Sequence, residues 1–331
     1  MYYYTIEDAL NSKNKAEKLC LRNQEIIFLP EEIQKLSKLK EIEIIEESPF
    51  LQELPSWLKE LKSLKKLFIR KSFISKIDNL PSNLTFLGVT ESNLNEIPLE
   101  IFKLKELQYL FLNDNNIEKI PSEIKELGSL VRFNIGHNKL TNLPNELTKL
   151  TSLKFFDAQS NAIEKLSTSD FIPTNLHAFD LTNNALTSLP FIAKNTSYLT
   201  LNYNKITDLT GIEEFEQLEA LNINNNQLKE LPDIFDKMSS LKNLDIENNH
   251  LTNFPPSFYK HHFENLTTEV SNFDILLISC KKLNLINSNF DYQIFEKRKS
   301  FSKAFFAKNY DASFKEVFYN IYLEKGRNSY S

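Results

Sequence analysis

Hydrophobic residues near the middle of the chain follow two different spacings, one directly after the other. Leu110 and Leu112 are two positions apart, as in a β-strand that buries one side. Ile120, Ile124 and Leu127 are then separated by four and three positions, as on one side of a short helix. A segment that changes spacing in this way is typical of one coil of a solenoid, in which a strand is followed by a return segment.

The same pattern recurs along most of the chain, and each copy carries a polar residue shortly after its strand. The position is Gln, Glu or Ser in the first four copies and Asn in the rest. Steps between these positions run from 20 to 25 residues, which gives eleven repeats. The polar positions are Gln24, Glu47, Ser72, Ser92, Asn115, Asn138, Asn161, Asn184, Asn204, Asn226 and Asn249.

The polar residue and the proline of each repeat have separate roles. An inward Asn side chain both donates and accepts hydrogen bonds, so we expect it to link the backbones of adjacent coils. A buried Glu is costly, so Glu47 predicts a distortion of the second repeat. Proline fixes φ and suits the start of a short helix, and acidic residues such as Glu123 and Glu146 follow it at the favourable end.

The full pattern, LxxLxLxxNxLxxLPxxIxxL, resembles that of the leucine-rich repeat family over residues 19 to 258. Its second half, LPxxIxxL, is similar to the subclass shared by Ras-pathway scaffold proteins and many bacterial repeat proteins. The resemblance implies an α/β solenoid that forms a curved, right-handed superhelix, with a parallel β-sheet on its concave face. It also implies recognition of a protein or peptide on that face, without naming the partner.

The repeats divide the chain into three predicted parts. Residues 1–18 are predicted to cap the first coil with a short helix, because Ile6, Ala9 and Leu10 share one face. Residues 19–258 form the repeats, and 259–331 form a helical C-terminal cap or a small appended module. Within this tail, a set of apolar residues at helical spacing is expected to be buried: Phe314, Val317, Phe318, Ile321 and Tyr322.

Positions that alternate with the inward residues of each strand are expected to line the concave face. Across repeats three to seven they carry aromatic and basic side chains, a composition typical of binding hot spots. The alternative is that these rings only cover one another, or that the tail folds over them. The predicted partner-binding residues are Lys66, Phe68, Arg70, Phe86, Tyr109, Phe111, Arg132 and Phe155.

Later strands carry Asp157, Asp180 and Asp245 at the corresponding positions. A solvated sheet face is as good an explanation of these residues as a second contact zone. One carboxylate per coil is ordinary for a surface, so we do not read them as a catalytic cluster.

Composition and charge limit the cellular compartments and the classes of partner that we expect. The formal net charge is -5, which is too small to indicate nucleic acid as a partner. The two cysteines, Cys20 and Cys280, are far apart, and no apolar run approaches the length of a membrane span. We expect a cytoplasmic monomer. An extracellular location stays open if a signal peptide has been removed.

The sequence offers little support for catalysis. None of its five glycines belongs to a phosphate-binding loop, and neither cysteines nor histidines have metal-ligand spacing. Cys280 lies in a tail too short for the ubiquitin-ligase domain that some bacterial repeat proteins carry. We therefore predict a non-enzymatic recognition module without a cofactor. The alternatives are an effector or adhesin whose tail carries a separate activity, and a scaffold without a discrete site.

Overall fold

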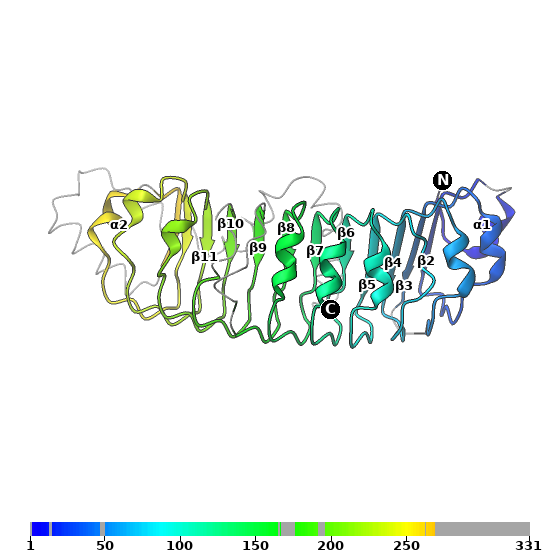
Figure 1. The fold of residues 1–331 in the computed structure, drawn as a ribbon, viewed down its shortest axis with the longest axis horizontal. Coiled ribbons are helices and arrows are strands. Elements are labelled where there is room, and N and C mark those ends of the chain that lie inside the picture. The colour runs from blue at the N-terminus through cyan, green and yellow to red at the C-terminus, as the bar shows by residue number, and fades with distance from the viewer. Residues whose placement is uncertain are drawn as a thin grey trace, which may run out of the picture. The chain divides into compact units, whose positions relative to one another are not determined.

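The computed structural model describes residues 2–12, 15–46, 50–164, 166, 176–190, 196–261 and 263–268 (Figure 1). All of these belong to one unit of the chain, residues 1–278. Cys280 and the predicted apolar face from Phe314 to Tyr322 lie outside the described residues.

The described strands form one sheet in which every pair of neighbours is parallel and the spatial order follows the sequence. Figure 1 shows them side by side along the molecule. Strands β2 to β12 coincide with the eleven predicted ones, and the short β1 and β13 extend the sheet at its ends. The strands are β1 (Tyr2–Tyr3), β2 (Lys18–Arg22), β3 (Glu41–Ile45), β4 (Lys66–Arg70), β5 (Phe86–Thr90), β6 (Tyr109–Phe111), β7 (Arg132–Asn134), β8 (Phe155–Asp157), β9 (Ala178–Asp180), β10 (Tyr198–Thr200), β11 (Ala220–Asn222), β12 (Asn243–Asp245) and β13 (Asn265–Thr267).

Short helices return the chain on the other side of most coils. Pro30, Pro55, Pro98, Pro121 and Pro144 each stand at the N-cap of a five-residue 3₁₀-helix, where a missing N–H costs nothing. The predicted role of proline is thus confirmed for these repeats. The helices are α1 (Ile6–Asn11), η1 (Glu31–Lys35), η2 (Ser56–Glu60), η3 (Leu99–Lys103), η4 (Ser122–Glu126), η5 (Asn145–Lys149), η6 (Ile212–Glu214), η7 (Phe235–Lys237) and α2 (Pro256–Lys260).

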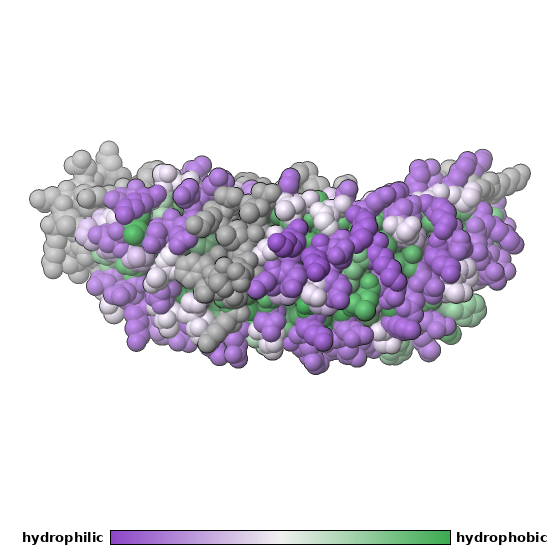
Figure 2. All heavy atoms as spheres, in the orientation of Figure 1, coloured by the Kyte–Doolittle hydropathy of each residue, from purple (hydrophilic) through white to green (hydrophobic). Residues whose placement is uncertain are grey.

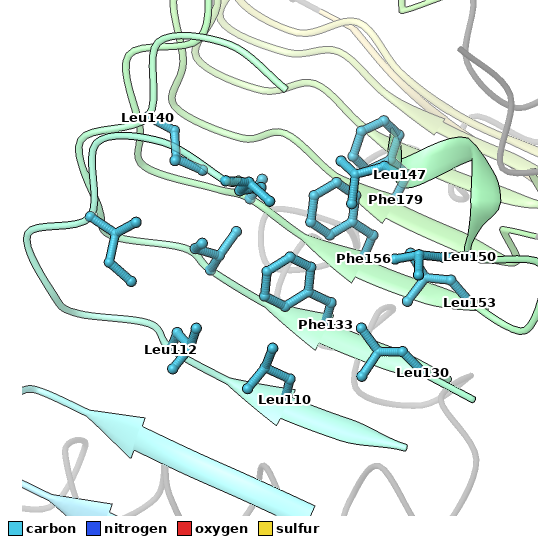
Figure 3. Packing of buried hydrophobic residues seen from close by; sticks show 14 of the residues in the cluster. Leu110, Leu112, Leu130, Phe133, Leu140, Leu147, Leu150, Leu153, Phe156 and Phe179 are labelled. Atoms are coloured by element: carbon cyan, nitrogen blue, oxygen red, sulfur yellow. The ribbon is translucent and has the colours of Figure 1, made fainter. Parts of the chain in front are cut away.

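One continuous hydrophobic core runs between the sheet and the return segments. In the middle coils it contains a column of stacked rings, with Phe133 and Phe156 5.4 Å apart and Phe156 and Phe179 5.3 Å apart (Figure 3). All three rings are buried. Each buried side chain of this size contributes about 1.5–3 kcal/mol, so stacking between coils is the main source of stability.

The described part of the face drawn in Figure 2 is mainly hydrophilic. Figure 2 shows one long face of the molecule, on which hydrophobic residues form only small groups between polar ones. The described α-helices are short, and no helix within the described part of the chain has the length and apolarity of a membrane span.

The predicted asparagine ladder is confirmed. The Nδ2 of Asn138 donates to the carbonyl oxygen of Leu112 in the preceding coil at 2.9 Å, and also to Ile135 in its own coil. Its Oδ1 accepts from the amide of Ile117 at 2.9 Å. One side chain therefore satisfies backbone groups of two coils, and the arrangement repeats from Asn115 to Asn249.

The link between the first two coils is made by a glutamate instead of an asparagine. Glu47 lies outside the described residues, and the buried Glu46 beside it accepts from the amides of Gln24 and Glu25. The side chain of Gln24, which occupies the ladder position of the first repeat, is exposed. Glu46 replaces it because two carboxylate oxygens can accept from two consecutive amides.

A left-handed residue precedes the ladder position in most coils, a feature that the sequence pattern did not predict. These residues have φ between 49° and 57°, and none of them is glycine. A side chain in this conformation is unfavourable by about 1–2 kcal/mol, which the hydrogen bonds of the ladder offset. The residues are Asn23, Lys71, Glu91, Asp114, His137, Ser160, Asn183, Tyr203, Asn225 and Asn248.

The N-terminal residues pack against the first coils. The hydroxyl of Thr5 accepts from the amide of Asp8 at 3.1 Å and so caps α1. Ala9 is fully buried, and Ile6 and Leu10 lie against the core. Strand β1 pairs with β2, so part of the N-terminal segment joins the sheet directly.

Candidate functional site

The candidate site lies on the side of the sheet opposite the core, which we call the concave face. Parallel register sets Phe86 beside Tyr109, Tyr109 beside Arg132, and Arg132 beside Phe155 on strands β5 to β8. These four side chains come from four coils but occupy equivalent positions. The regular spacing of the repeats therefore converts four distant residues into one row.

Phe86 is the centre of a ring cluster at the N-terminal end of this row. Its ring stacks on Phe111 at 5.2 Å and on Tyr109 at 6.0 Å, and it meets Phe68 edge-on at 6.3 Å. The sequence prediction that these rings lie together is thus correct. Their mutual contact fixes the orientation of each ring.

Their exposure differs from the sequence expectation. Phe68 and Phe111 are only 4% and 3% exposed, whereas Phe86 and Tyr109 are half-buried. The expectation that all these rings face solvent is wrong for Phe68 and Phe111. Gly88 lies between those two residues in the register and has no side chain, so the neighbouring rings can close over it.

The basic residues that border the cluster are engaged in contacts within the protein. Lys66 pairs with Glu43 and lies 5.0 Å from the centre of the Phe86 ring. The Nε of Arg70 donates to Glu91 at 2.8 Å. These ion pairs join adjacent coils and neutralise much of the positive charge at this end of the face.

Arg132 is buried within the row and packs against a neighbouring ring. It is 7% exposed, and its guanidinium lies 4.4 Å from the centre of the Phe155 ring. A planar cation over an aromatic face is a stable arrangement, so Arg132 supports Phe155 from one side. The prediction of an exposed arginine is therefore wrong at this position.

Two further residues extend the row beyond the predicted patch. The exposed His177 meets the Phe155 ring at 5.8 Å and the Tyr198 ring at 5.0 Å. Burial and the nearby Glu219 raise the pKa of Tyr198, whose hydroxyl donates to that carboxylate at 3.3 Å. Strand alternation alone could have indicated Tyr198, but His177 precedes its strand and gives no such signal.

Asp157 and Asp180 are direct neighbours on β8 and β9. Asp157 accepts from the amide of Gln159 at 3.0 Å, and Asp180 accepts from the amide of Thr182 at 2.8 Å. Burial, followed by the charge of Asp180, raises the pKa of Asp157 to about 7. Burial also raises the pKa of Asp180.

Asp245 follows the same rule, since it accepts from the amide of Glu247 at 3.2 Å. Each of these three aspartates thus binds the amide two positions on and holds the turn after its strand. This local role is sufficient to explain one carboxylate per coil.

Possible metal ligands and thiols are two further kinds of candidate group among the described residues. Within the described ranges, no three His, Cys, Asp or Glu side chains are arranged to hold a metal ion. Cys20 is a buried free cysteine, and burial raises the pKa of its thiol, which favours the unreactive protonated form.

Comparisons with known families agree with the geometry. The leucine-rich repeat region family matches residues 72–172, and the Leucine Rich Repeat family matches residues 217–238 and 240–261. The chain carries leucine-rich repeats in these ranges. No curated protein sequence matches it significantly. The LPxxIxxL subclass stays a prediction.

Several solved structures share the fold. The leucine-rich repeat protein LIC12759 of Leptospira interrogans has a TM-score of 0.53 and 21% identity, over 81% of this chain and 88% of that one. Internalin InlF of Listeria monocytogenes has a TM-score of 0.57 and 20% identity, over 81% and 86%. The plant peptide hormone receptor RGFR1, in complex with RGF2, has a TM-score of 0.61 and 24% identity, over 81% and 46%. At these identities the likeness establishes the fold, a curved solenoid with a parallel sheet.

Proposed function

We propose that this protein is a non-enzymatic recognition module that binds a protein or peptide partner on the concave face. The contact surface is the aromatic row, which we define as Phe86, Tyr109, Phe155, His177 and Tyr198. The observation that carries the proposal is the alignment of two ring groups on strands β5 to β10: Phe86 stacks on Tyr109, and His177 contacts Phe155 and Tyr198. Arg132 lies between the two groups in the register, with its guanidinium over Phe155. The rings are half-buried or exposed, so each offers part of its surface to a partner.

The side chains packed against the aromatic row favour binding, because they hold its rings in place. Phe68 and Phe111 are buried against Phe86, and Arg132 lies against Phe155. Rings held in this way lose little conformational freedom when a partner docks on them. Aromatic side chains with such support are the residues that dominate binding energy in protein interfaces.

The charge along the face gives the partner an orientation. Lys66 and Arg70 are balanced by Glu43 and Glu91 near the start of the row. The later strands carry Asp157, Asp180 and Asp245 at their outward positions. A partner that lies along the row meets balanced charges at one end and carboxyl groups at the other. Because the pKa values of these carboxyl groups are raised, their charge, and with it the rate and salt dependence of association, varies with pH.

The fold is compatible with this role. The receptor RGFR1, which shares it, is in complex with RGF2. We further propose that this protein acts in the cytoplasm as a monomer and needs no cofactor.

The test is affinity for a partner captured from the native source. Tyr109→Ala and Phe155→Ala should each weaken binding by roughly 2 kcal/mol, a typical loss for a central aromatic residue. Leu99→Ala is a matched control, because Leu99 is an exposed hydrophobic residue on η3 and lies away from the row. All variants should melt like the parent.

Two outcomes contradict the proposal. Parent affinity in both aromatic variants would place the site elsewhere. If removal of residues 269–331 then abolished binding, the activity would belong to the tail, as the effector or adhesin alternative holds.

A further inference from the structure

Asp157 and Asp180 are the last residues of β8 and β9 and direct neighbours in the register. Each holds the turn after its strand by accepting from a backbone amide. On the preceding strand, β7, Asn134 makes the same bond with a neutral side chain, because its Oδ1 accepts from the amide of Gly136 at 3.0 Å. The turn therefore needs an oxygen acceptor, and the negative charge of the two aspartates is an addition to that role.

The two aspartates lack a cation within the described part of the chain. The ion pairs among the described residues do not include Asp157 or Asp180. Burial, followed by the negative charges of Asp180 and Asp114, raises the pKa of Asp157 to about 7. Neighbouring carboxyl groups without a cation make each other's ionised form less stable.

The first coils treat their carboxylates differently on the same side of the sheet. Glu41 on β3 pairs with Lys18 on β2 at 2.7 Å, and Glu43 on β3 pairs with Lys66 on β4. At that end of the sheet the protein supplies its own cations from adjacent strands. At β8 and β9 it does not.

The basic residues of the middle coils belong to the starts of their strands. Lys154 and His177 precede β8 and β9, whereas the two aspartates end these strands, three residues or about 10 Å further on. Arg132 begins β7, and its guanidinium lies over the Phe155 ring. These cations thus lie beside the rings and not at the carboxyl pair.

We propose that the partner presents a basic side chain, lysine or arginine, to Asp157 and Asp180 and an apolar side chain to Phe155 and Tyr198. This inference rests on the proposed role of the aromatic row in binding. On β8 the aspartate lies two positions beyond the ring, a separation of about 6.6–7 Å. Side chains two positions apart on an extended peptide have the same separation, so one short segment reaches both groups.

The chemistry of the pair favours a basic polypeptide over other ligands. A carboxylate has about four acceptor sites, so it can bind a cation and keep its hydrogen bond to the turn. A metal ion would need further ligands, and among the described side chains no three of His, Cys, Asp or Glu are arranged to hold one. Nucleic acid carries phosphates, which the carboxylates repel.

Selection of peptides on the full chain tests the proposal. The probe is a library of random peptides displayed on phage, selected at about pH 8, above the pKa of about 7 of Asp157. Peptides that lose binding to Phe155→Ala are retained, because they bind the aromatic row. The retained peptides should carry Lys or Arg two positions from an aromatic or aliphatic residue.

A thermodynamic cycle then locates the charge contact. Asp157→Asn combined with Asp180→Asn keeps an oxygen for each turn and should weaken the retained peptides about tenfold, as expected when one side of a close charge pair is removed. Norleucine or citrulline in place of the peptide's lysine or arginine should weaken binding to the parent but not to this double variant. Asp236→Asn is the matched control, since Asp236 is exposed on η7, on the other side of its coil, and it should leave affinity unchanged.

The outcomes separate this inference from the proposed function. Retained peptides without an excess of basic residues would overturn the inference and leave the proposed function intact. An equal loss from norleucine or citrulline in the parent and in the double variant would do the same. The peptide exchange on the parent needs no protein variant, so it stays decisive even if the double variant folds poorly. A library without any peptide that depends on Phe155 would overturn the proposed function, and this inference with it.

Discussion

The ring of Phe68 lies over Gly88, its direct neighbour on the adjacent strand. A Cβ atom on Gly88 would overlap this ring, with Cε2 of Phe68 only 2.9 Å away, and it would lie 3.4 Å from the ring of Phe86. The missing side chain of Gly88 is thus what allows Phe68 to pack beneath the aromatic row. The support of the proposed binding surface depends on one glycine.

Gly88→Ala should therefore destabilise the protein by about 1–3 kcal/mol, the usual cost of overpacking, because Phe68 must leave its position. Gly128→Ala is a matched control, since no heavy atom lies within 4 Å of the place that its new Cβ would occupy, and it should be neutral or slightly stabilising. Chemical denaturation measures both. Equal midpoints for the two variants would show that Phe68 does not depend on Gly88.

Asn138→Ala should cost about 1–3 kcal/mol, because the carbonyl of Leu112 and the amide of Ile117 lose their partner. Leu112→Ala, in the same stack, should cost about 2–5 kcal/mol through the cavity that it leaves. The exposed Asn142→Ala serves as control and should change stability little. An unchanged denaturation midpoint for Asn138→Ala would contradict its role as the link between coils.

The raised pKa values of Asp157 and Asp180 predict that the stability of the protein depends on pH. The pKa of Asp157 is raised to about 7 in the folded protein, against 3.8 as its ordinary value. The folded state therefore holds this proton more tightly, and its contribution to stability is largest below about pH 4 and decreases up to about pH 7.

Asp180→Asn should reduce this decrease, because it removes the neighbouring charge and keeps an oxygen for the amide of Thr182. Asp208→Asn is the control, since hydrogen bonds from Thr210 lower the pKa of Asp208 from 3.8, so that Asp208 is ionised in both states over the measured range and should not alter the slope there. Unfolding free energies at pH 5 and pH 8 measure the effect. Identical pH dependence in Asp180→Asn and the parent would mean that the two carboxylates do not interact.

Tyr203 has a φ of 56° and its side chain is 58% exposed. The left-handed conformation is therefore unfavourable in free energy, and few side-chain contacts offset it. Tyr203→Asn should stabilise the protein by about 0.5–1 kcal/mol, because Asn tolerates this conformation better. Lys205→Asn lies two residues on, is exposed and has no positive φ, so it should not stabilise. A melting temperature for Tyr203→Asn at or below that of the parent would contradict this explanation.

Much of the fold was predictable because each coil repeats the same spacing of apolar and polar residues. The alternation around Leu110 and Leu112 placed a strand at β6, and the same rule placed ten others. Asn138 and its equivalents were predictable as ladder residues because one side chain at one register position serves two coils. Periodicity of this kind fixes which residues point inward, and hence the core.

Contacts between side chains of different coils could be determined only from the tertiary structure. Strand alternation places Phe68, Phe111 and Arg132 at outward positions. It does not indicate that neighbouring side chains cover them. That outcome depends on the absent side chain of Gly88, one coil away, and on the ring of Phe155. His261 is a similar case, because its two ring nitrogens lie close to the carbonyl oxygens of Phe235 and Leu241 in the preceding coil. The sequence by itself determined the solenoid, since local spacing sets the coil. Only tertiary packing decided which outward side chains stay accessible, because that depends on the side chains of neighbouring coils.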